Sequence, residues 1–293
     1  MDNLIQATYN GLVLASIYAL MAMGFTLIYG ALRFLNLALG SLFTLGGYVA
    51  WIVTGQWGWF PLLGVIAAFI VVAVVGAASF QVVVRPLVGR PGWDIATIIA
   101  TLGFGIVLEN LIQWLFGPRN KAIPLLLKGN FKIGDTLRGQ YQQLITIAIA
   151  VAILLLMGLF LTRSRHGLAI RAVAQNRDAA YLNGVSVNRV FMIVMAISAG
   201  LAAVAGVLLT PVLFLNPTVG LVTGLKGLVV TIFGGLGSIV GTLYAAVIIG
   251  LLESFVSLYF GSKWSLPAIF AFLIVVLVVR PGGIAGLAEE SRV

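Results

Sequence analysis

The longest charge-free runs of the sequence set the strongest limit on its fold. No charged residue lies between Asn3 and Leu32, and after Arg33 the next charge is Arg85. A bilayer core about 30 Å thick is crossed by roughly 20 apolar residues in a helix. Without water, backbone polar groups must bond to one another, which leaves helices or a closed barrel. Because these runs are continuous rather than alternating, the sequence predicts an all-α, polytopic membrane helix bundle.

Composition indicates the same class of protein. The 293 residues are 61% hydrophobic and only 9% charged, with a mean hydropathy of +1.13, whereas soluble domains carry about 25% charged residues. The basic residues behind the net charge of +9 lie between the apolar runs, where they are typical of cytoplasmic loops and lipid contact rather than nucleic-acid binding. The absence of cysteine excludes disulfides and thiolate metal sites.

Eight apolar segments are separated by polar or Gly- and Pro-containing breaks. The segment at 222–257 contains GGLGSIVG, so it is predicted to cross the membrane once, to cross twice or to be re-entrant. The sequence GQWGWFP at 55–61 predicts a turn at the membrane interface. We therefore expect about 8–9 transmembrane segments in a single domain covering residues 1–293. The apolar segments are 3–32, 34–54, 62–84, 94–116, 141–161, 190–214, 222–257 and 264–280.

The loop at 162–189 is polar and basic between two long apolar segments. It carries five of the seventeen basic residues and the only histidine, His166. Such a loop is typical of a solvated cytoplasmic turn, and it is also the kind of surface that meets a soluble partner. A short helix is predicted around 174–184.

The distribution of basic residues predicts the orientation. One span separates the loop at 162–189 from the polar loop at 117–140, so the two loops lie on opposite faces with five basic residues each. Three further arginines share the face of 162–189 if every span crosses once, and this excess favours that face as cytoplasmic. The C-terminal Arg280 and Arg292 join it only if 222–257 crosses twice. The three arginines are Arg33, Arg85 and Arg90.

The chain lacks the residues of an energy source or a catalyst. The dipeptide Gly-Lys never occurs, so the sequence contains no Walker A phosphate loop. No HExxH or GxSxG motif is present, and a single histidine cannot supply a multi-histidine metal site. The acidic residues within predicted spans are Glu109 and Glu253, too few for an ordinary proton relay. The sequence therefore predicts a transport body that is not an enzyme and binds no metal or cofactor.

The loop at 162–189 contains a spacing that resembles a known docking motif. Asp178, Ala179 and Ala180 are followed after three residues by Gly184, which is similar to the EAA motif through which bacterial ABC importer permeases bind their ATPases. Small alanines allow a short helix to enter a groove of a partner. A glycine can end such a helix with a positive φ angle, and an acidic residue near its start is favoured by the helix dipole.

Further segments resemble the permeases of branched-chain amino-acid ABC importers, the Liv type. They occur in the family's order and extend from about residue 11 to residue 283. Two positions differ, since the family's intramembrane histidine and a following glutamate correspond to Leu39 and Ser41. The similar segments are 11–20, 29–30, 36–40, 101–103, 109–110, 165–172, 226, 234–239 and 279–283.

The resemblance implies a permease subunit in a bacterial inner membrane, with ATP bound by two separate ABC ATPase subunits. A second homologous permease or a second copy would complete the path, and a periplasmic or extracellular solute-binding protein would deliver the solute. The residues expected to couple to the ATPase are Arg171, Asn176, Asp178, Ala179, Ala180 and Gly184. The residues expected along the translocation path are Asn36, Thr101, Glu109, Asn110 and Lys226.

The sequence is compatible with several alternatives. The solute is a branched-chain or related neutral amino acid, or else urea or a short amide, and a self-contained channel or secondary carrier is the alternative class. Glu109 either lines the path with Thr101 or lies at the membrane boundary. Lys226 and Glu253 either extend to an interface, pair across helices as a brace or contact solute. Asn36 either caps a helix or lines a polar site.

Overall fold

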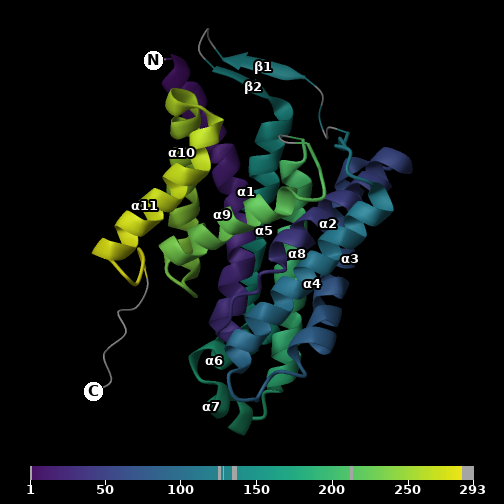
Figure 1. Ribbon diagram of the computed structural model, residues 1–293, viewed down its shortest axis with the longest axis vertical. Helices are drawn as coiled ribbons and strands as arrows, with labels where there is room; N and C mark the ends of the chain where they lie inside the picture. The colour runs from purple at the N-terminus through teal and green to yellow at the C-terminus, as the bar shows by residue number, and fades with distance from the viewer. Residues whose placement is uncertain (1, 125–126, 128, 134–136, 212–213, 286–293) are drawn as a thin grey trace.

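The computed structural model describes residues 2–124, 127, 129–133, 137–211 and 214–285. Within them the chain is a bundle of long helices whose N-terminal end carries a small β-hairpin (Figure 1). Two short helices extend from the opposite end of the bundle (Figure 1). In the described part of the chain, seven helices are long and apolar enough to cross a membrane. The predicted helical, multi-pass bundle is confirmed, and the number of crossings stays a prediction.

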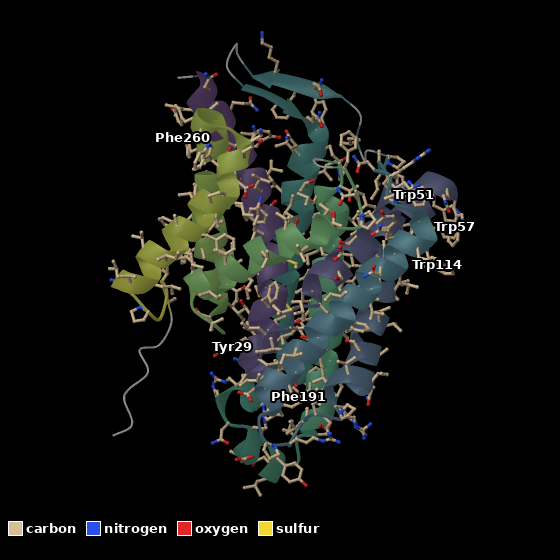
Figure 2. The ribbon with its side chains drawn as sticks, in the orientation of Figure 1. Tyr29, Trp51, Trp57, Trp114, Phe191 and Phe260 are labelled. Atoms are coloured by element: carbon tan, nitrogen blue, oxygen red, sulfur yellow. The ribbon has the colours of Figure 1, made fainter. Side chains whose placement is uncertain are left out.

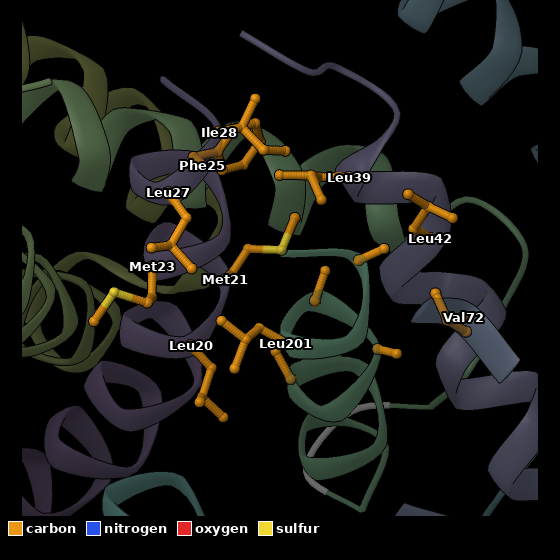
Figure 3. Close-up of a cluster of buried hydrophobic side chains, with 14 of the residues drawn as sticks. Leu20, Met21, Met23, Phe25, Leu27, Ile28, Leu39, Leu42, Val72 and Leu201 are labelled. Carbon is orange, nitrogen blue, oxygen red and sulfur yellow. The ribbon is translucent and has the colours of Figure 1, made fainter. Parts of the chain in front are cut away.

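Two helices form the centre of the bundle. They are α1 (Asp2–Leu32) and α8 (Val187–Leu209), and most of each spanning segment is buried. Leu20 and Met21 of α1 lie beside Leu201 of α8 in the main core cluster (Figure 3). Burial on almost every side explains why these two helices are apolar around their whole circumference rather than along one stripe.

The first half of the chain adds three further helices, of which α2 and α3 pack on α8 and α4 packs on α2. Prolines and glycines set their ends, because Pro61 occupies the first turn of α3 and Gly117 follows α4 with a φ of +73°. These elements are α2 (Leu39–Trp51) with the π-helical η1 (Ile52–Gln56), α3 (Pro61–Ser79) with the π-helical η2 (Phe80–Val84), and α4 (Trp93–Phe116).

The start of α2 differs from the predicted segment at 34–54. The helix begins at Leu39, because residues 33–38 form a break in which Arg33 has a φ of +60°. Inside the break the Asn36 side-chain oxygen accepts a hydrogen bond from the Ala38 amide at 3.0 Å. Apolar composition alone did not reveal this interruption, since four of the six residues in the break are apolar.

The polar loop at 117–140 contains an element that was not predicted. The strands β1 (Asn130–Ile133) and β2 (Leu137–Gln140) pair antiparallel as a hairpin that leads directly into α5 (Tyr141–Arg163). Phe131 of the hairpin packs edge-on against Tyr9 of α1, with ring centroids 6.0 Å apart. The hairpin therefore covers the N-terminal end of the bundle (Figure 1).

The segment at 222–257 consists of two helices rather than one. They are α9 (Val219–Gly234) and α10 (Ile239–Phe260), joined by a turn at 235–238 and inclined to each other (Figure 1). After the short η3 (Ser262–Trp264), α11 (Ser265–Val279) runs back along the bundle. Arg280 follows α11, whereas Arg292 lies outside the described residues.

Glycines allow two helix crossings in which backbones touch. A β-carbon placed on Gly220 of α9 would overlap the carbonyl oxygen of Gly40 in α2, and one on Gly206 of α8 would overlap the carbonyl oxygen of Phe43. In lipid there is no hydrophobic driving force between helices, so close van der Waals packing drives their association, and small residues make this packing possible. Close backbone contact through glycine thus joins α2 to both α8 and α9.

Tryptophan side chains gather at one end of the bundle. Trp51, Trp57 and Trp114 gather near the end that carries the hairpin (Figure 2). Trp57 and Trp59 are 60% and 56% exposed in the non-helical stretch between η1 and α3. This arrangement agrees with the predicted interfacial turn at 55–61, because tryptophans concentrate where a bilayer meets water.

Candidate functional site

Two short helices form the end of the molecule opposite the hairpin (Figure 1). They are α6 (Arg165–Gln175) and α7 (Arg177–Leu182). Ser164 caps α6 by accepting from the Gly167 amide at 2.9 Å, and Asn176 caps α7 by accepting from the Ala179 amide at 2.9 Å. The cap at Asn176 has an extended backbone that separates the two helices. The predicted helix around 174–184 is therefore α7, preceded by a break.

Gly184 closes α7 as the sequence predicts. Its φ angle is +81°, its amide donates to the Tyr181 carbonyl at 2.9 Å, and the Val185 amide donates to the Ala180 carbonyl at 3.0 Å. These two bonds make a Schellman motif, which favours glycine because other residues rarely adopt this conformation. Asp178 lies in the first turn of α7, where a negative charge is stabilised by the helix dipole.

The side chains of α7 divide into an inner and an outer set. Ala180 is buried against the core of its own chain, so its small size serves this internal contact. Asp178 and Ala179 are exposed, and the large apolar Tyr181 and Leu182 are 70% and 84% exposed. Sequence reasoning did not select Tyr181 and Leu182, although they lie within the Asp178–Gly184 spacing.

Arg177 fastens α7 to the membrane helices. Its guanidinium lies over the rings of Trp93 and Phe191, 5.1 Å and 4.9 Å from their centroids, and donates to the Leu32 carbonyl at 3.5 Å. These partners belong to the start of α4, the first half of α8 and the last turn of α1. Phe191 accordingly lies near the α6–α7 end of the bundle (Figure 2). One planar cation thus joins α7 to three membrane helices.

Burial lowers the pKa of Arg177 from its ordinary value, and the nearby Arg33 lowers it further while Asp178 opposes the shift. Arginine nevertheless stays protonated in proteins, so the site holds a permanent positive charge. Arg33 also contacts the loop by donating to the Ala174 carbonyl at 3.3 Å. Arg171 is exposed and donates to the Thr162 carbonyl at the limiting distance of 3.5 Å.

A small cavity within the bundle contains one of the predicted path residues. It measures about 100 Å³, and its walls come from α1, α2, α4 and α9. Glu109 and Gly105 line it from α4, and Ser41 lines it from α2. The glycines Gly40 and Gly220 complete the wall where α2 crosses α9. Apart from Glu109 and Ser41, its lining is apolar or glycine.

Three other predicted path residues bond within the chain. Asn36 is buried and directs its amide nitrogen towards the Met195 sulfur at 3.6 Å. Thr101 is also buried and accepts a hydrogen bond from the Leu37 amide at 3.3 Å, satisfying the broken backbone before α2. Asn110 is exposed on α4 and donates to the Ile106 carbonyl at 2.8 Å. None of the three is among the residues that line the small cavity.

Lys226 lies in a different cavity, on the other side of α9. Its ammonium is 2.5 Å from the Glu253 carboxylate of α10 and 3.3 Å from the Tyr18 hydroxyl of α1, to which it donates. Tyr18 in turn donates to the second carboxylate oxygen of Glu253 at 2.6 Å. The predicted possibility that Lys226 and Glu253 pair across helices is realised, with Tyr18 as a third member.

This second cavity is larger and more polar. It measures about 670 Å³ and extends from Lys226 towards Asn3 and Ser262, at the hairpin end of the molecule. Because α9 separates it from the small cavity, the structure does not bring Lys226 and Glu109 into one chamber. Glu109 and Lys226 thus lie on opposite sides of α9, and the other three predicted path residues line neither cavity.

Comparison with known proteins identifies the family of this bundle. The family model described as branched-chain amino acid transport system / permease component matches residues 7–279. The chain belongs to this permease family. It is 34% identical to the high-affinity branched-chain amino acid transport system permease protein BraD of Pseudomonas aeruginosa, over 99% of this chain and 98% of that protein.

Two further relatives extend the similarity. The permease is 32% identical to the high-affinity branched-chain amino acid transport system permease protein LivH of Escherichia coli K12, over 99% of this chain and 97% of that protein. It is 28% identical to the probable branched-chain amino acid transport permease protein LivH of Methanocaldococcus jannaschii, over 95% and 91%. With seven membrane-capable helices, the permease is a multi-pass membrane protein.

Proposed function

We propose that this permease is the membrane subunit of a bacterial ABC importer for branched-chain or related neutral amino acids. The observation that carries the proposal is the similarity to transport permeases over nearly the whole length of both chains. The α6–α7 pair supports it, because a chain whose sequence contains no Walker A loop needs a surface through which an external ATPase can act. ATP is then bound by the partner subunits, and the permease itself carries no cofactor.

The exposed side of α7 is proposed to be the ATPase contact. Tyr181 and Leu182 present a large apolar surface outside the membrane-spanning helices, next to the exposed Asp178 and Ala179. Exposed aromatic and aliphatic side chains at the tip of a rigid helix are typical anchors for a pocket on a partner. Arg177 lies on the inner side of the same helix and passes its displacement to α1, α4 and α8.

The orientation follows from charge. Arg33 contacts α6 directly, so Arg33 and the basic residues of the loop at 162–189 occupy the same end of the molecule. We propose that this end is cytoplasmic. The hairpin and the polar cavity then face outwards, where a periplasmic or extracellular solute-binding protein would dock. A second homologous permease, or a second copy of this one, would complete the translocation path within the bacterial inner membrane.

Movement of solute is proposed to come from rocking of helices rather than from chemistry. Closure of two ATPase subunits on ATP would shift α7, and the shift would pass through Arg177 to the central helices. Crossings such as Gly40 against Gly220 place backbone against backbone, with no side chains interlocked between them at these points. Small relative movements of α2 and α9 can then open one cavity at the expense of the other.

The contact can be tested by replacing Leu182 with aspartate. The charge should lower co-purification of the ATPase subunits by about tenfold or more, because it removes a buried leucine from the interface and leaves a carboxylate in its place. ATP-dependent leucine uptake into proteoliposomes should fall with it. Leu127→Asp is the matched control, since Leu127 is half-exposed in the loop at the opposite end of the molecule.

Two results would count against the proposal. Normal ATPase association and normal uptake with Leu182→Asp would show that α7 is not the contact. Leucine uptake by the permease alone, without ATPase subunits or ATP, would instead establish a self-contained channel or carrier. Uptake of a short amide in place of leucine by the complete importer would keep the importer class and replace the solute.

A further inference from the structure

The polar cavity follows one face of α1 through half the depth of the bundle. Asn3, Gln6, Asn10 and Tyr18 all line it, at spacings that place them on one side of a helix. At 1.5 Å per residue, Asn3 and Tyr18 are separated by about 22 Å along the helix axis. The cavity therefore leads from the outer surface to the charged pair near the middle of a bilayer about 30 Å thick.

The charged pair forms the inner end of this cavity. The side chains of Lys226 and Glu253 are 13% and 11% exposed, and both line the cavity wall. Tyr18 is almost fully buried behind them and holds one oxygen of Glu253. The two opposite charges are thus in contact with each other and also accessible to a solute that enters the cavity.

The charges are not needed to hold these helices together. The pair joins α9 to α10, and these helices also touch where a β-carbon on Gly241 would overlap the carbonyl oxygen of Gly234. A β-carbon on Gly250 of α10 would likewise meet the backbone of Gly11 and Ala15 in α1. A buried ion pair is weak evidence for stability, because apolar residues of similar volume often stabilise a protein as well or better. Ionisable residues within a membrane are expensive and are retained for function.

We infer that Lys226 and Glu253 form a binding site for the zwitterionic head of a neutral α-amino acid at the inner end of the outward-facing cavity. Among the described residues that line the cavity, Lys226 and Glu253 are the charged ones, so their sum is zero and a ligand without net charge is matched. The inference rests on the proposed function for the direction of entry and for the choice of an amino acid.

Each end of the zwitterion has a counterpart in this pair. The ligand carboxylate would accept from the Lys226 ammonium, and the ligand ammonium would donate to Glu253, which keeps its bond to Tyr18. Charge-assisted hydrogen bonds of this kind are about twice as strong as neutral ones. The side chain of the ligand would meet an apolar wall, since Val13 and Leu14 line the cavity within two turns of Tyr18 and Val222 lines it one turn before Lys226.

The absence of cysteine from the sequence allows a direct test of this site. Ser257 lines the cavity on α10, one turn beyond Glu253, so Ser257→Cys places a near-isosteric reporter beside the charged pair. The assembled transporter, purified in detergent, is treated with a maleimide with and without leucine. Leucine at ten times its dissociation constant should slow the reaction roughly tenfold, because about one site in eleven is then free.

Three controls define the site. The first control combines Lys226→Met and Glu253→Gln, which removes both charges and keeps the side-chain volumes. In this variant leucine should no longer slow the reaction of Ser257→Cys with the maleimide. The uncharged 4-methylpentanamide, with the carbon skeleton of leucine, should not protect the reporter in the intact pair. Ser41→Cys, which reports on the small cavity beside Glu109, should react at the same rate with and without leucine.

The outcomes separate this inference from the proposed function. Undiminished protection in the charge-neutral variant, equal protection by the amide, or protection of Ser41→Cys alone would overturn the site. An unchanged melting temperature of the charge-neutral variant would show that it folds like the parent. Full leucine uptake by this variant would also overturn the site. Failure of the unmodified importer to take up any amino acid would instead overturn the proposed function.

Discussion

Single glycines decide how closely helices approach in this permease. Gly220 and Gly40 meet backbone to backbone, and a methyl group on Gly220 has no space. Both residues lie at the small cavity, so the crossing also shapes a candidate path. The effect of a substitution here therefore depends on the contact and not on helix propensity, which favours alanine over glycine in a helix.

Gly220→Ala should destabilise the purified permease by about 1–3 kcal/mol, because overpacking forces the two backbones apart. The measurement is the thermal unfolding midpoint in detergent. Gly103→Ala is the matched control, since a β-carbon on Gly103 meets nothing within 4 Å. A midpoint that is equally unaffected by both substitutions would contradict the crossing.

Arg177 is the residue on which the connection between α7 and the membrane helices depends. Its two aromatic contacts are each worth about 0.5–2 kcal/mol, and the broad planar guanidinium makes both of them while also donating to the Leu32 carbonyl. We expect Arg177→Ala to lower the amount of solute moved per ATP hydrolysed by about tenfold, while ATPase subunits still bind. Arg177→Lys should restore little of the loss, since lysine lacks the planar group.

The control for Arg177 is Arg163→Ala, because Arg163 is an exposed cation in the last turn of α5 near the same loop. It removes the same charge without touching Trp93 or Phe191. If both variants lower coupling equally, net charge rather than the ring contacts explains the effect.

At the scale of elements, α7 is too short to be stable by itself. A helix of six residues has no favourable equilibrium in water, so it depends on the Asn176 cap, the Gly184 motif and burial of Ala180. Ala180 is buried by the core of the bundle, whereas the cap and the Gly184 motif come from residues within or next to α7. This local origin explains why the end of α7 and the position of Asp178 could be predicted from sequence.

Asn176→Ala should cost about 1 kcal/mol in the stability of α7 through loss of the cap. Hydrogen exchange of the amides at 177–185 should then become about fivefold faster. Asn176→Asp retains an oxygen that accepts the same bond and should leave exchange unchanged. Equal exchange rates in the alanine and aspartate variants would show that the cap does not hold α7.

The other elements show what limits prediction from sequence. The helices at 93–116 and 141–163 agree with the predicted segments, because charged or polar loops border them on both sides. The beginning of α2 was wrong by five residues, since the interruption before it depends on Arg33 and a bond from Leu37 to Thr101. That bond joins residues 64 positions apart and leaves no local pattern.

The candidate sites follow the same rule. Lys226 and Glu253 stand out in sequence as charges within apolar segments, so each could be selected. Their common partner Tyr18 could not, because it lies 208 and 235 positions away from them. The same holds for Arg177, whose rings come from α4 and α8. Sequence identified the charges, and only the packed bundle shows what each charge faces.

At the scale of the whole molecule, the two ends of the bundle differ in charge and in shape. One end carries the hairpin and the open polar cavity, and the other carries α6, α7 and Arg33 (Figure 1). This difference between the two ends predicts that the permease inserts in a single orientation, with α7 in the cytoplasm. The proposed delivery of solute from outside depends on this orientation.

Single cysteines can test the orientation, since the parent chain has none. The two positions are Ser262, which lies in η3 at the outer end, and Asn183, which follows α7; each is replaced by cysteine. A membrane-impermeant maleimide added to intact spheroplasts should label Ser262→Cys and should reach Asn183→Cys only after permeabilisation. The reverse pattern would invert the proposed orientation and with it the roles of both ends.

Helix α9 forms a wall shared by the two cavities, and this arrangement constrains its length. Leu225 faces the small cavity and Lys226 faces the polar one, since successive residues are about 100° apart around a helix. Inserting or deleting one residue upstream in α9 would turn Lys226 away from Glu253 and carry apolar residues into its place. Within this family, α9 should therefore accept exchanges of side chains far more readily than any change in the number of its residues.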